Sequence, residues 1–333
     1  MIISKTPFRI SLGGGGTDLP FYYEKEGGFF LSAAIQRYVY ILVSNRYEKN
    51  IRVSYSQTEI CDTVEEIQHP IVKECLKMLD LTEHIEIISY ADMPAQSGLG
   101  SSGSFTVGLL HSLLTFNRQD IIRKDLAEMA CNVEMDLLKE PSGKQDQYIA
   151  TFGNLTCFTI KKNGDVDVEP LKISDYAKET LENNLVFFDT GIIRSASEVL
   201  KDQKNNSHKN PMSLEYLNKI KEIGLDIKKC LENDDVDEFG RLMDYHWNEK
   251  KKTSSKISNS LIDKQYELAK KNGALGGKII GAGGGGFLMF YVKDREAKNS
   301  LRKEFISSGL REVKMPFESE GSKIIFNLSS KFQ

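Results

Sequence analysis

The sequence predicts an α+β fold in two domains, and three observations lead to this prediction. The first half mixes short strand-like segments with helical ones, whereas long helical patterns dominate after residue 210. The chain has 333 residues, a length that suggests roughly two domains. A hairpin-like pair of apolar segments follows the long helices, and helices on an antiparallel sheet make an α+β unit. We expect one domain over residues 1–180 and a second over 181–333.

Composition limits the functions to consider. The chain is 40% hydrophobic and 27% charged, as globular proteins are, and its net charge of −3 gives no reason to expect nucleic-acid binding. The absence of a signal-peptide pattern and of an apolar run of ~20 residues predicts a cytoplasmic protein without a membrane span. Five cysteines without metal-ligand spacing or pairing pattern indicate a reducing compartment: Cys61, Cys75, Cys131, Cys157 and Cys230.

The first predicted element is a strand over residues 2–12 that ends in four glycines. Apolar residues alternate along it with polar ones such as Arg9, which is typical of a strand with one buried face. Backbone without side chains, as in Gly13–Gly16, can turn sharply or touch a ligand. Arg9 and Asp18 would then flank a bare loop. The alternatives are a flexible turn for the glycines and a helix-capping role for Asp18.

The segment Met93–Phe105, MPAQSGLGSSGSF, is the centre of the functional argument. It follows a strand-like run, residues 85–90, and opens a helical pattern. Its small residues leave backbone N–H groups uncovered, and the start of a helix adds unpaired donors and a positive dipole end, which favour a phosphate. No Gly-Lys-Ser or Gly-Lys-Thr follows, so the loop is not a common P-loop. A tight turn with a serine N-cap is the alternative interpretation.

Two carboxylates stand out beyond this loop. Glu134 falls within the apolar stripe of a helix predicted over residues 120–139, and a carboxylate on an inward face needs a partner unless it reaches solvent at the edge. Asp146 lies in the first turn of a short helix that follows Pro141 and Gly143. By itself, Asp146 could simply complement the helix dipole.

The remaining elements are predicted from the same patterns. A third glycine cluster, Gly281–Gly286, is expected at the tip of a hairpin within residues 276–292. The polar stretch Lys204–Asn210 is expected to be a surface loop. Further strands are expected at residues 29–35, 38–45, 51–55, 154–160, 165–169, 185–189, 311–315 and 323–328, and further helices at 67–79, 211–232, 236–250, 258–272 and 295–307.

Three glycine-rich signatures in this order resemble those of the GHMP kinases: FRISLGGGGTD, PAQSGLGSSGS and KIIGAGGGGF. The resemblance spans about residues 6–290. It implies an N-terminal domain like the second domain of ribosomal protein S5, a ferredoxin-like C-terminal domain and an active site between them. The segments PFRISLGGGGTDLPFYYEKEGG and GKQDQY resemble the branch that forms sugar 1-phosphates, including the kinases that convert heptose 7-phosphate to the 1,7-bisphosphate for activated heptoses.

The resemblance implies ATP and Mg²⁺ as cofactors and a role for each matching residue. Mg²⁺ would bind Glu134 and one of the two serines in the phosphate loop, while Asp146 and Arg9 would act at the acceptor hydroxyl. The ATP phosphates would bind a loop made of Gly98, Leu99, Gly100, Ser101, Ser102 and Gly103. The sugar would be bound by residues from the first and third glycine clusters: Gly14, Gly15, Gly16, Thr17, Asp18, Gly284 and Gly285.

The phosphate already present on such a sugar requires a cation. Lys144, two residues before Asp146, and Arg194, which follows a predicted strand, are the candidates, although either could be an ordinary exposed base.

Other functions stay open at this point. The chain could phosphorylate another sugar, such as fucose or an N-acetylhexosamine, or a mevalonate-type alcohol. It could also be a sensor that binds ATP and sugar without turnover, although a pure sensor need not keep Arg9, Glu134 and Asp146. The five histidines show no metal-ligand spacing, which gives a hydrolase little support.

Overall fold

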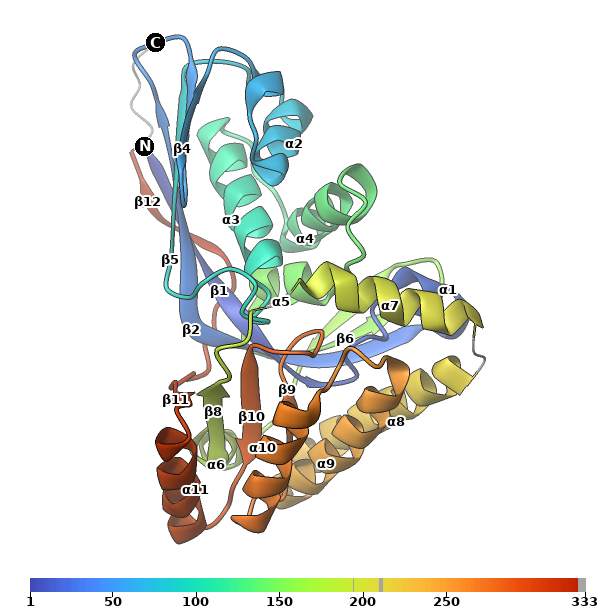
Figure 1. The fold of residues 1–333 in the computed structure, drawn as a ribbon. Helices are drawn as coiled ribbons and strands as arrows, with labels where there is room; N and C mark the ends of the chain where they lie inside the picture. The colour runs from blue at the N-terminus through green and yellow to red at the C-terminus, as the bar shows by residue number, and fades with distance from the viewer. Residues whose placement is uncertain (194, 210–211, 329–333) are drawn as a thin grey trace.

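The computed structural model describes residues 1–193, 195–209 and 212–328, which form two sheets with helices packed on them (Figure 1). The first sheet is mostly antiparallel and has the strand order β12-β1-β2-β5-β3-β4, with β6 and β7 joined to the other end of β2. Its strands are β1 (Ile2–Gly13), β2 (Gly28–Asn45), β3 (Ile51–Ser54), β4 (Thr58–Cys61), β5 (Ile85–Ala91), β6 (Leu155–Ile160), β7 (Val166–Pro170) and β12 (Lys323–Asn327).

The long strand β2 lies at the centre of the first sheet and pairs with β1, β5 and β6. The sequence predicts two strands separated at Gln36 and Arg37, but the structure has one continuous strand. Pro7 of β1 pairs with Tyr38 and Phe8 with Ile35, so Gln36 and Arg37 are the extra residues of a bulge. A bulge bends a strand without ending it, which lets β2 pair with β6 in its first half and with β5 in its second.

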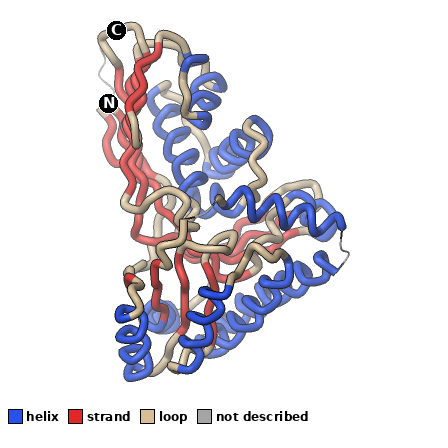
Figure 2. Tube along the Cα trace, in the orientation of Figure 1, coloured by secondary structure: helices blue, strands red, loops and turns tan. Residues whose placement is uncertain are grey.

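Helices cover one face of the first sheet (Figure 2). The central one, α3 (Ser101–Phe116), packs against β1 and β2 through buried residues such as Leu109, Leu110 and Leu113. Its neighbours are the helices α2 (Pro70–Met78), α4 (Arg123–Cys131) and α5 (Gln145–Phe152). The short helix η1 (Val64–Glu66) packs on α2, and α1 (Pro20–Glu26) follows the first glycine run. The N–H of Arg9 donates to the carbonyl of Leu99, so the N-terminus of α3 lies beside the second half of β1.

The second sheet is antiparallel, with the strand order β11-β8-β10-β9. Its strands are β8 (Leu185–Asp189), β9 (Gly276–Ile279), β10 (Phe287–Tyr291) and β11 (Arg311–Glu312). The helices around it are α6 (Asp175–Asn184), α8 (Met212–Glu232), α9 (Val236–Thr253), α10 (Ser260–Lys271) and α11 (Arg295–Ser307). α9 packs against β9 and buries Trp247, the single tryptophan of the chain, against Tyr266.

The second half of the chain also contacts the first sheet. α8 packs on β1 and β2, where a Cβ on Gly224 would lie 2.9 Å from the nitrogen of Gly14. β12 pairs with β1, and the amino group of Met1 donates a hydrogen bond of 2.8 Å to the carbonyl of Leu328. The two-domain division at residues 180 and 181 stays a prediction, and the last strand lies in the first sheet.

One predicted surface loop is wrong. Residues 204–209 of the stretch Lys204–Asn210 belong to a helix, α7 (Ala196–Lys209), and residue 210 lies outside the described residues. Val199 and Gln203, one turn apart on α7, are buried against the rest of the molecule. This tertiary packing stabilises a helix whose other residues are mostly polar.

The helix predicted over residues 120–139 consists of two pieces. α4 ends at Cys131 and is followed by one π-helical turn, η2 (Asn132–Leu137), which carries Glu134. All five cysteines are buried and form no disulfide. No helix in residues 1–193, 195–209 and 212–328 has the length and apolar character needed to cross a membrane.

Candidate active site

A cavity of about 410 Å³ lies where the three glycine clusters meet. The first cluster lines it with Gly15 and Gly16, and the third with Gly281 and Ala282. The central loop contributes Gly98, Gly100, Ser101 and Ser102. The clusters are far apart in the sequence, and the ends of β1, α3 and β9 bring them to one place.

The central loop and the third cluster touch through their backbones. A Cβ on Gly98 would lie 2.8 Å from the carbonyl oxygen of Ile280, and a Cβ on Gly281 would lie 2.6 Å from that of Gly98. Gly98 also has φ = +84°, which disfavours any other residue. The glycines therefore allow the two loops to approach each other closely. They also leave the backbone open to a ligand.

The N-terminus of α3 faces this cavity. Gly100 is its N-cap and supplies no side chain to the first helical N–H groups, which belong to Ser101, Ser102 and Gly103. Uncapped N–H groups and the positive end of the helix dipole together favour a bound anion. This local geometry agrees with the phosphate-binding role expected for the loop.

Arg9 and Asp146 form an ion pair beside the same helix end. The Nε group of Arg9 donates to Oδ1 of Asp146 at 2.7 Å, and Nη2 lies 2.7 Å from the same oxygen in an ion pair. The Nη1 group donates to the carbonyl of Gly98 at 2.6 Å. Arg9 is buried, whereas the side chain of Asp146 is 31% exposed and lines the cavity. The pair therefore holds a carboxylate at the cavity wall next to the central glycine loop.

Close packing of α3 on α5 places Asp146. A Cβ on Gly103 would lie 2.6 Å from Cβ of Asp146, and one on Gly100 would lie 3.2 Å from its Cγ. Only residues without a side chain permit this approach, so the two glycines fix the distance between the helix end and the carboxylate.

Glu134 is buried in the π-helical turn and lines the cavity. Its Oε2 accepts a hydrogen bond of 2.9 Å from the hydroxyl of Ser102, whereas its Oε1 has no hydrogen-bond partner. Burial raises the pKa of Glu134 to about 7; the hydroxyls of Thr106 and Ser102 oppose this rise and the charge of Asp146 adds to it. A buried carboxylate oxygen without a partner fits a bound cation.

The donor set fits Mg²⁺ in company with phosphates. No group of three or more His, Cys, Asp or Glu residues suitable for a metal occurs in the described part of the chain. Mg²⁺ is commonly held by one or two carboxylates together with the phosphates of a nucleotide. Glu134 and the nearby serine hydroxyls supply the protein side of such a site.

Asp18 connects the first glycine run to α5. Its Oδ1 accepts a hydrogen bond from the N–H of Gly16 at 3.0 Å, and its Oδ2 accepts one from the N–H of Gln145 at 3.1 Å. Burial raises the pKa of Asp18 above its ordinary value, the N–H groups oppose this, and Asp146 adds to the rise. Asp18 lines the cavity, where its remaining acceptor capacity can meet sugar hydroxyls.

Several residues of the predicted sugar site support the loops and do not line the cavity. The hydroxyl of Thr17 donates to the carbonyls of Gly14 and Phe29, which closes the first glycine turn. Gly284 donates its N–H to the carbonyl of Ile257, and Gly285 packs against the backbone of residue 192. Leu99, predicted for the ATP-phosphate loop, does not line the cavity either: it is buried, and its carbonyl accepts a hydrogen bond from the N–H of Arg9.

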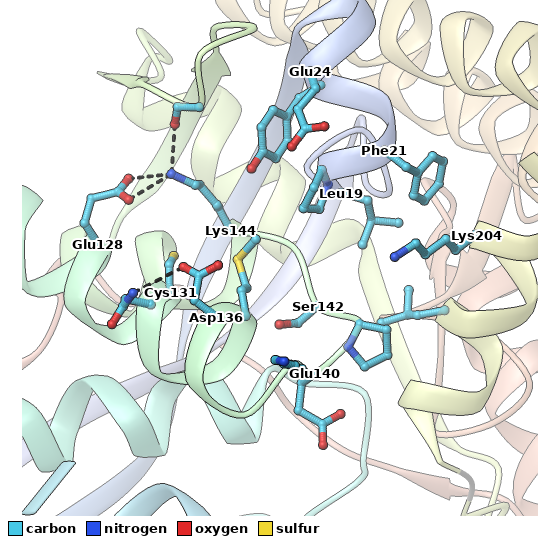
Figure 3. A pocket seen from close by; sticks show the side chains of 18 of the residues that line it. Leu19, Phe21, Glu24, Glu128, Cys131, Asp136, Glu140, Ser142, Lys144 and Lys204 are labelled. Carbon is cyan, nitrogen blue, oxygen red and sulfur yellow. Dashed lines mark hydrogen bonds and ion pairs between the residues drawn. The ribbon is translucent and has the colours of Figure 1, made fainter. Parts of the chain in front are cut away.

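The two cations predicted for the sugar phosphate are not found in this cavity. Lys144 donates to both carboxylate oxygens of Glu128 and to the carbonyl of Gly164, each at 2.8 Å, and lines a different cavity of about 850 Å³ (Figure 3). Arg194 lies outside the described residues.

Other cavity residues are absent from the sequence-based prediction. Gln145 donates from its amide to the hydroxyls of Ser11 and Ser32 and lies directly before Asp146. His246, Lys250 and Lys278 come from the second half of the chain and also line this cavity. The four-residue spacing of His246 and Lys250 on a predicted helix was the one available signal, and nothing in the sequence connects them to Lys278.

Comparison with known proteins agrees with the fold. The family model described as GHMP kinases N terminal domain matches residues 68–154, and that described as GHMP kinases C terminal matches residues 227–310. The D-glycero-alpha-D-manno-heptose 7-phosphate kinase of Campylobacter jejuni is 31% identical over 322 residues, which cover 91% of this chain and 94% of the relative. A galactokinase of Pyrococcus furiosus is 24% identical, with 92% and 94% of the two chains covered.

A solved structure shows the same architecture. The crystal structure of a D-glycero-D-manno-heptose 1-phosphate kinase from Bacteroides thetaiotaomicron superposes with a TM-score of 0.82 at 25% identity, covering 99% of this chain and all of that one.

Proposed function

The chain belongs to the GHMP kinases as a sugar kinase similar to those of heptose phosphates, and we propose that it transfers phosphate from ATP to the anomeric hydroxyl of D-glycero-D-manno-heptose 7-phosphate. The product would be the 1,7-bisphosphate, a precursor of nucleotide-activated heptoses for surface polysaccharides. The observation that carries this proposal is the Arg9–Asp146 pair beside the uncapped N-terminus of α3. It supplies a carboxylate for an acceptor hydroxyl next to a place for the transferred phosphate.

The proposed mechanism rests on positioning and on charge stabilisation. Phosphoryl transfer spreads negative charge over the moving group and needs an acceptor oxygen held in line with the leaving oxygen. The first N–H groups of α3 and its dipole would stabilise the charge on the phosphates. Asp146 would accept a hydrogen bond from the anomeric hydroxyl and receive its proton, while Arg9 keeps the carboxylate in place.

Mg²⁺ would be held by Glu134 and by Ser101 or Ser102. When bound, it supplies positive charge that neutralises the phosphate oxygens of ATP. Asp18, Gly15 and Gly16 would hold the sugar hydroxyls on the side of the cavity next to Asp146. The arrangement of these residues around one cavity supports this division of roles.

The test is a coupled assay of ATP consumption with Mg²⁺ and a panel of acceptors: heptose 7-phosphate, heptose 1-phosphate, mannose, fucose, galactose and mevalonate. Phosphorus NMR of the product identifies the phosphorylated position. We expect a new anomeric phosphate with heptose 7-phosphate. If only another acceptor is phosphorylated, that acceptor is the substrate and the heptose assignment is wrong. ATP binding without turnover of any acceptor would favour a sensor.

A further inference from the structure

Three basic side chains gather on the wall of the cavity formed by the second half of the chain. His246 and Lys250 lie one turn apart on the same face of α9, and Lys278 lies on β9, which packs against this helix. The close packing depends on Gly276, where a Cβ would lie 2.2 Å from the carbonyl oxygen of Gly240. All three side chains line the same cavity as Asp146 and Arg9.

Two members of this basic cluster are almost fully buried and have no partner. Lys278 and His246 are each 1% exposed, and both ring nitrogens of His246 lack a hydrogen bond. Among the described residues, no ion pair or hydrogen bond of the Lys278 ammonium is found, while Lys250 donates to the carbonyl of Gly281. Buried lysines are rare unless a counter-charge compensates them.

Protonation of Lys278 and His246 is unfavourable in the ligand-free protein, because burial and neighbouring positive charges act against it. The pKa of Lys278 is lowered well below its ordinary value, first by burial and then by Lys250 and Arg9. The pKa of His246 is lowered in the same way by burial, Lys278 and Lys250. A fold that keeps such groups together without a carboxylate loses stability, and this loss is typical of a site that an anionic ligand completes.

We propose that Lys278, Lys250 and His246 form the subsite for the phosphate that the acceptor sugar already carries. This inference rests on the proposed function, since it assigns the second phosphate of that substrate. The cluster and the Arg9–Asp146 pair lie in one cavity, so a phosphosugar can present its hydroxyl to Asp146 and its phosphate to the cluster. A phosphate monoester carries close to two negative charges and accepts several charge-assisted hydrogen bonds, which matches a cluster of donors.

The same cluster could in principle serve the phosphates of ATP, and this is the competing outcome of the test. The N-terminus of α3, where no side chain caps the first N–H groups, already provides donors for those phosphates. Lys144, in contrast, is held by Glu128 and Gly164 and lines the second cavity, so it has no comparable position.

The test compares Lys278→Met with wild type in steady-state kinetics. Met retains most of the length of the side chain and removes its charge, so the buried strand can keep its packing. The KM for heptose 7-phosphate should rise about 10- to 100-fold, as expected for a lost charge-assisted hydrogen bond, while the KM for ATP stays within about threefold. Lys252→Met, on the same helix but outside the cavity, is the matched control and should leave both values unchanged.

Two further measurements separate a binding role from a structural one. The ligand-free Lys278→Met variant should have a higher Tm than wild type, because it removes a buried amine that has no hydrogen-bond partner among the described residues and whose protonation is unfavourable. Calorimetric titration with heptose 7-phosphate in the absence of ATP should show weaker binding to this variant, and the same heptose without phosphate should bind both proteins equally. An increase in the KM for ATP with the KM for the phosphosugar unchanged, or an equal loss for both heptoses, would overturn the proposal.

Failure of the proposed function would be recognised separately. If wild type does not phosphorylate heptose 7-phosphate, inorganic phosphate serves as the probe of the subsite in thermal unfolding. Protection of wild type but not of Lys278→Met would still support an anion subsite. Equal protection of both proteins would overturn it.

Discussion

Asp146 is the residue on which the proposed reaction depends most directly. Its Oδ1 accepts a hydrogen bond and an ion-pair contact from Arg9, and the carboxylate is partly exposed in the cavity. Asp146→Asn keeps an oxygen for Arg9 but cannot accept a proton. We expect kcat to fall about 10²- to 10⁴-fold, with the KM values within about threefold, in the coupled kinase assay. Asp167→Asn, at an exposed ion pair with Lys161, should retain wild-type kcat. An unchanged kcat in Asp146→Asn would remove Asp146 from the mechanism.

Glu134 makes stability depend on pH when Mg²⁺ is absent. Burial raises the pKa of Glu134 from 4.5 to about 7. Between these two pH values the carboxyl group of Glu134 is therefore protonated in the folded protein and ionised in the unfolded chain. This contribution to stability is complete below pH 4.5 and is lost as the pH rises through 7, a change of at most about 3 kcal/mol. In chelator, the free energy of unfolding of wild type should therefore fall relative to that of Glu134→Gln over this range, as measured by urea denaturation.

Mg²⁺ provides the control for this pH effect. Above pH 7 the ionised carboxylate should bind the cation, so added Mg²⁺ should stabilise wild type and leave Glu134→Gln unchanged. Parallel pH profiles for the two proteins would show that Glu134 does not titrate in this range.

At the scale of elements, the spacing between α3 and α5 is the most sensitive feature. In Gly103→Ala, the added methyl would lie 2.6 Å from Cβ of Asp146, so the two helices must move apart. We expect kcat to fall about 10²-fold, because displacements of about 1 Å misalign reacting groups, and Tm to fall as well. Gly309→Ala is the control, since it has φ = +85° and open space around it. It should lower Tm without lowering kcat, and an equal kcat for both variants would contradict the spacing argument.

The elements that the sequence predicts well are those whose pattern is local. The strand over residues 2–12, the helix that opens after the central glycine loop and the hairpin around Gly281–Gly286 all follow from spacing and composition. The sequence could not reveal the bulge at Gln36 and Arg37, because a polar interruption in a strand resembles a turn. It also could not reveal α7, whose helical state depends on packing of Val199 and Gln203 against distant residues.

The candidate site divides in the same way. Residues near a glycine loop, such as Arg9 and Asp146, could be selected from the sequence, and the structure brings them into contact. The basic cluster could not be predicted from the sequence, because α9 and β9 meet only in the folded chain. Lys144 was a reasonable candidate by proximity to Asp146, but the backbone turns it toward Glu128.

At the scale of the whole molecule, residues 1–180 lack parts of their own sheet. β12 covers the edge of β1, Phe317 bridges to Ile35, and α8 packs on the glycine run after β1. The fragment 1–180 should therefore fail to form a compact monomer in size-exclusion chromatography and circular dichroism. Co-expression of 181–333 should restore folding. A fragment that unfolds cooperatively alone would establish an independent N-terminal domain.

A circular permutant supplies the control for this experiment. Met1 and Leu328 are hydrogen bonded, so residues 1 and 328 can be joined, and new ends can be placed at the exposed Tyr47. This protein keeps every strand pairing in one chain and should retain kinase activity. If the permutant does not fold, then an altered chain order is enough to prevent folding, and the failure of the fragment 1–180 cannot be assigned to the absence of β12 and α8.

Trp247 follows His246 directly in α9 and is the only indole in the chain. Its ring is buried against Tyr266, with the ammonium of Lys251 5.8 Å from its centre. Indole emission responds to the electric field around the ring, so an anion arriving at the basic cluster should change the fluorescence of this single emitter. Rapid mixing experiments could then time the arrival of the phosphosugar without any label, while ATP entering at α3 leaves the signal nearly constant.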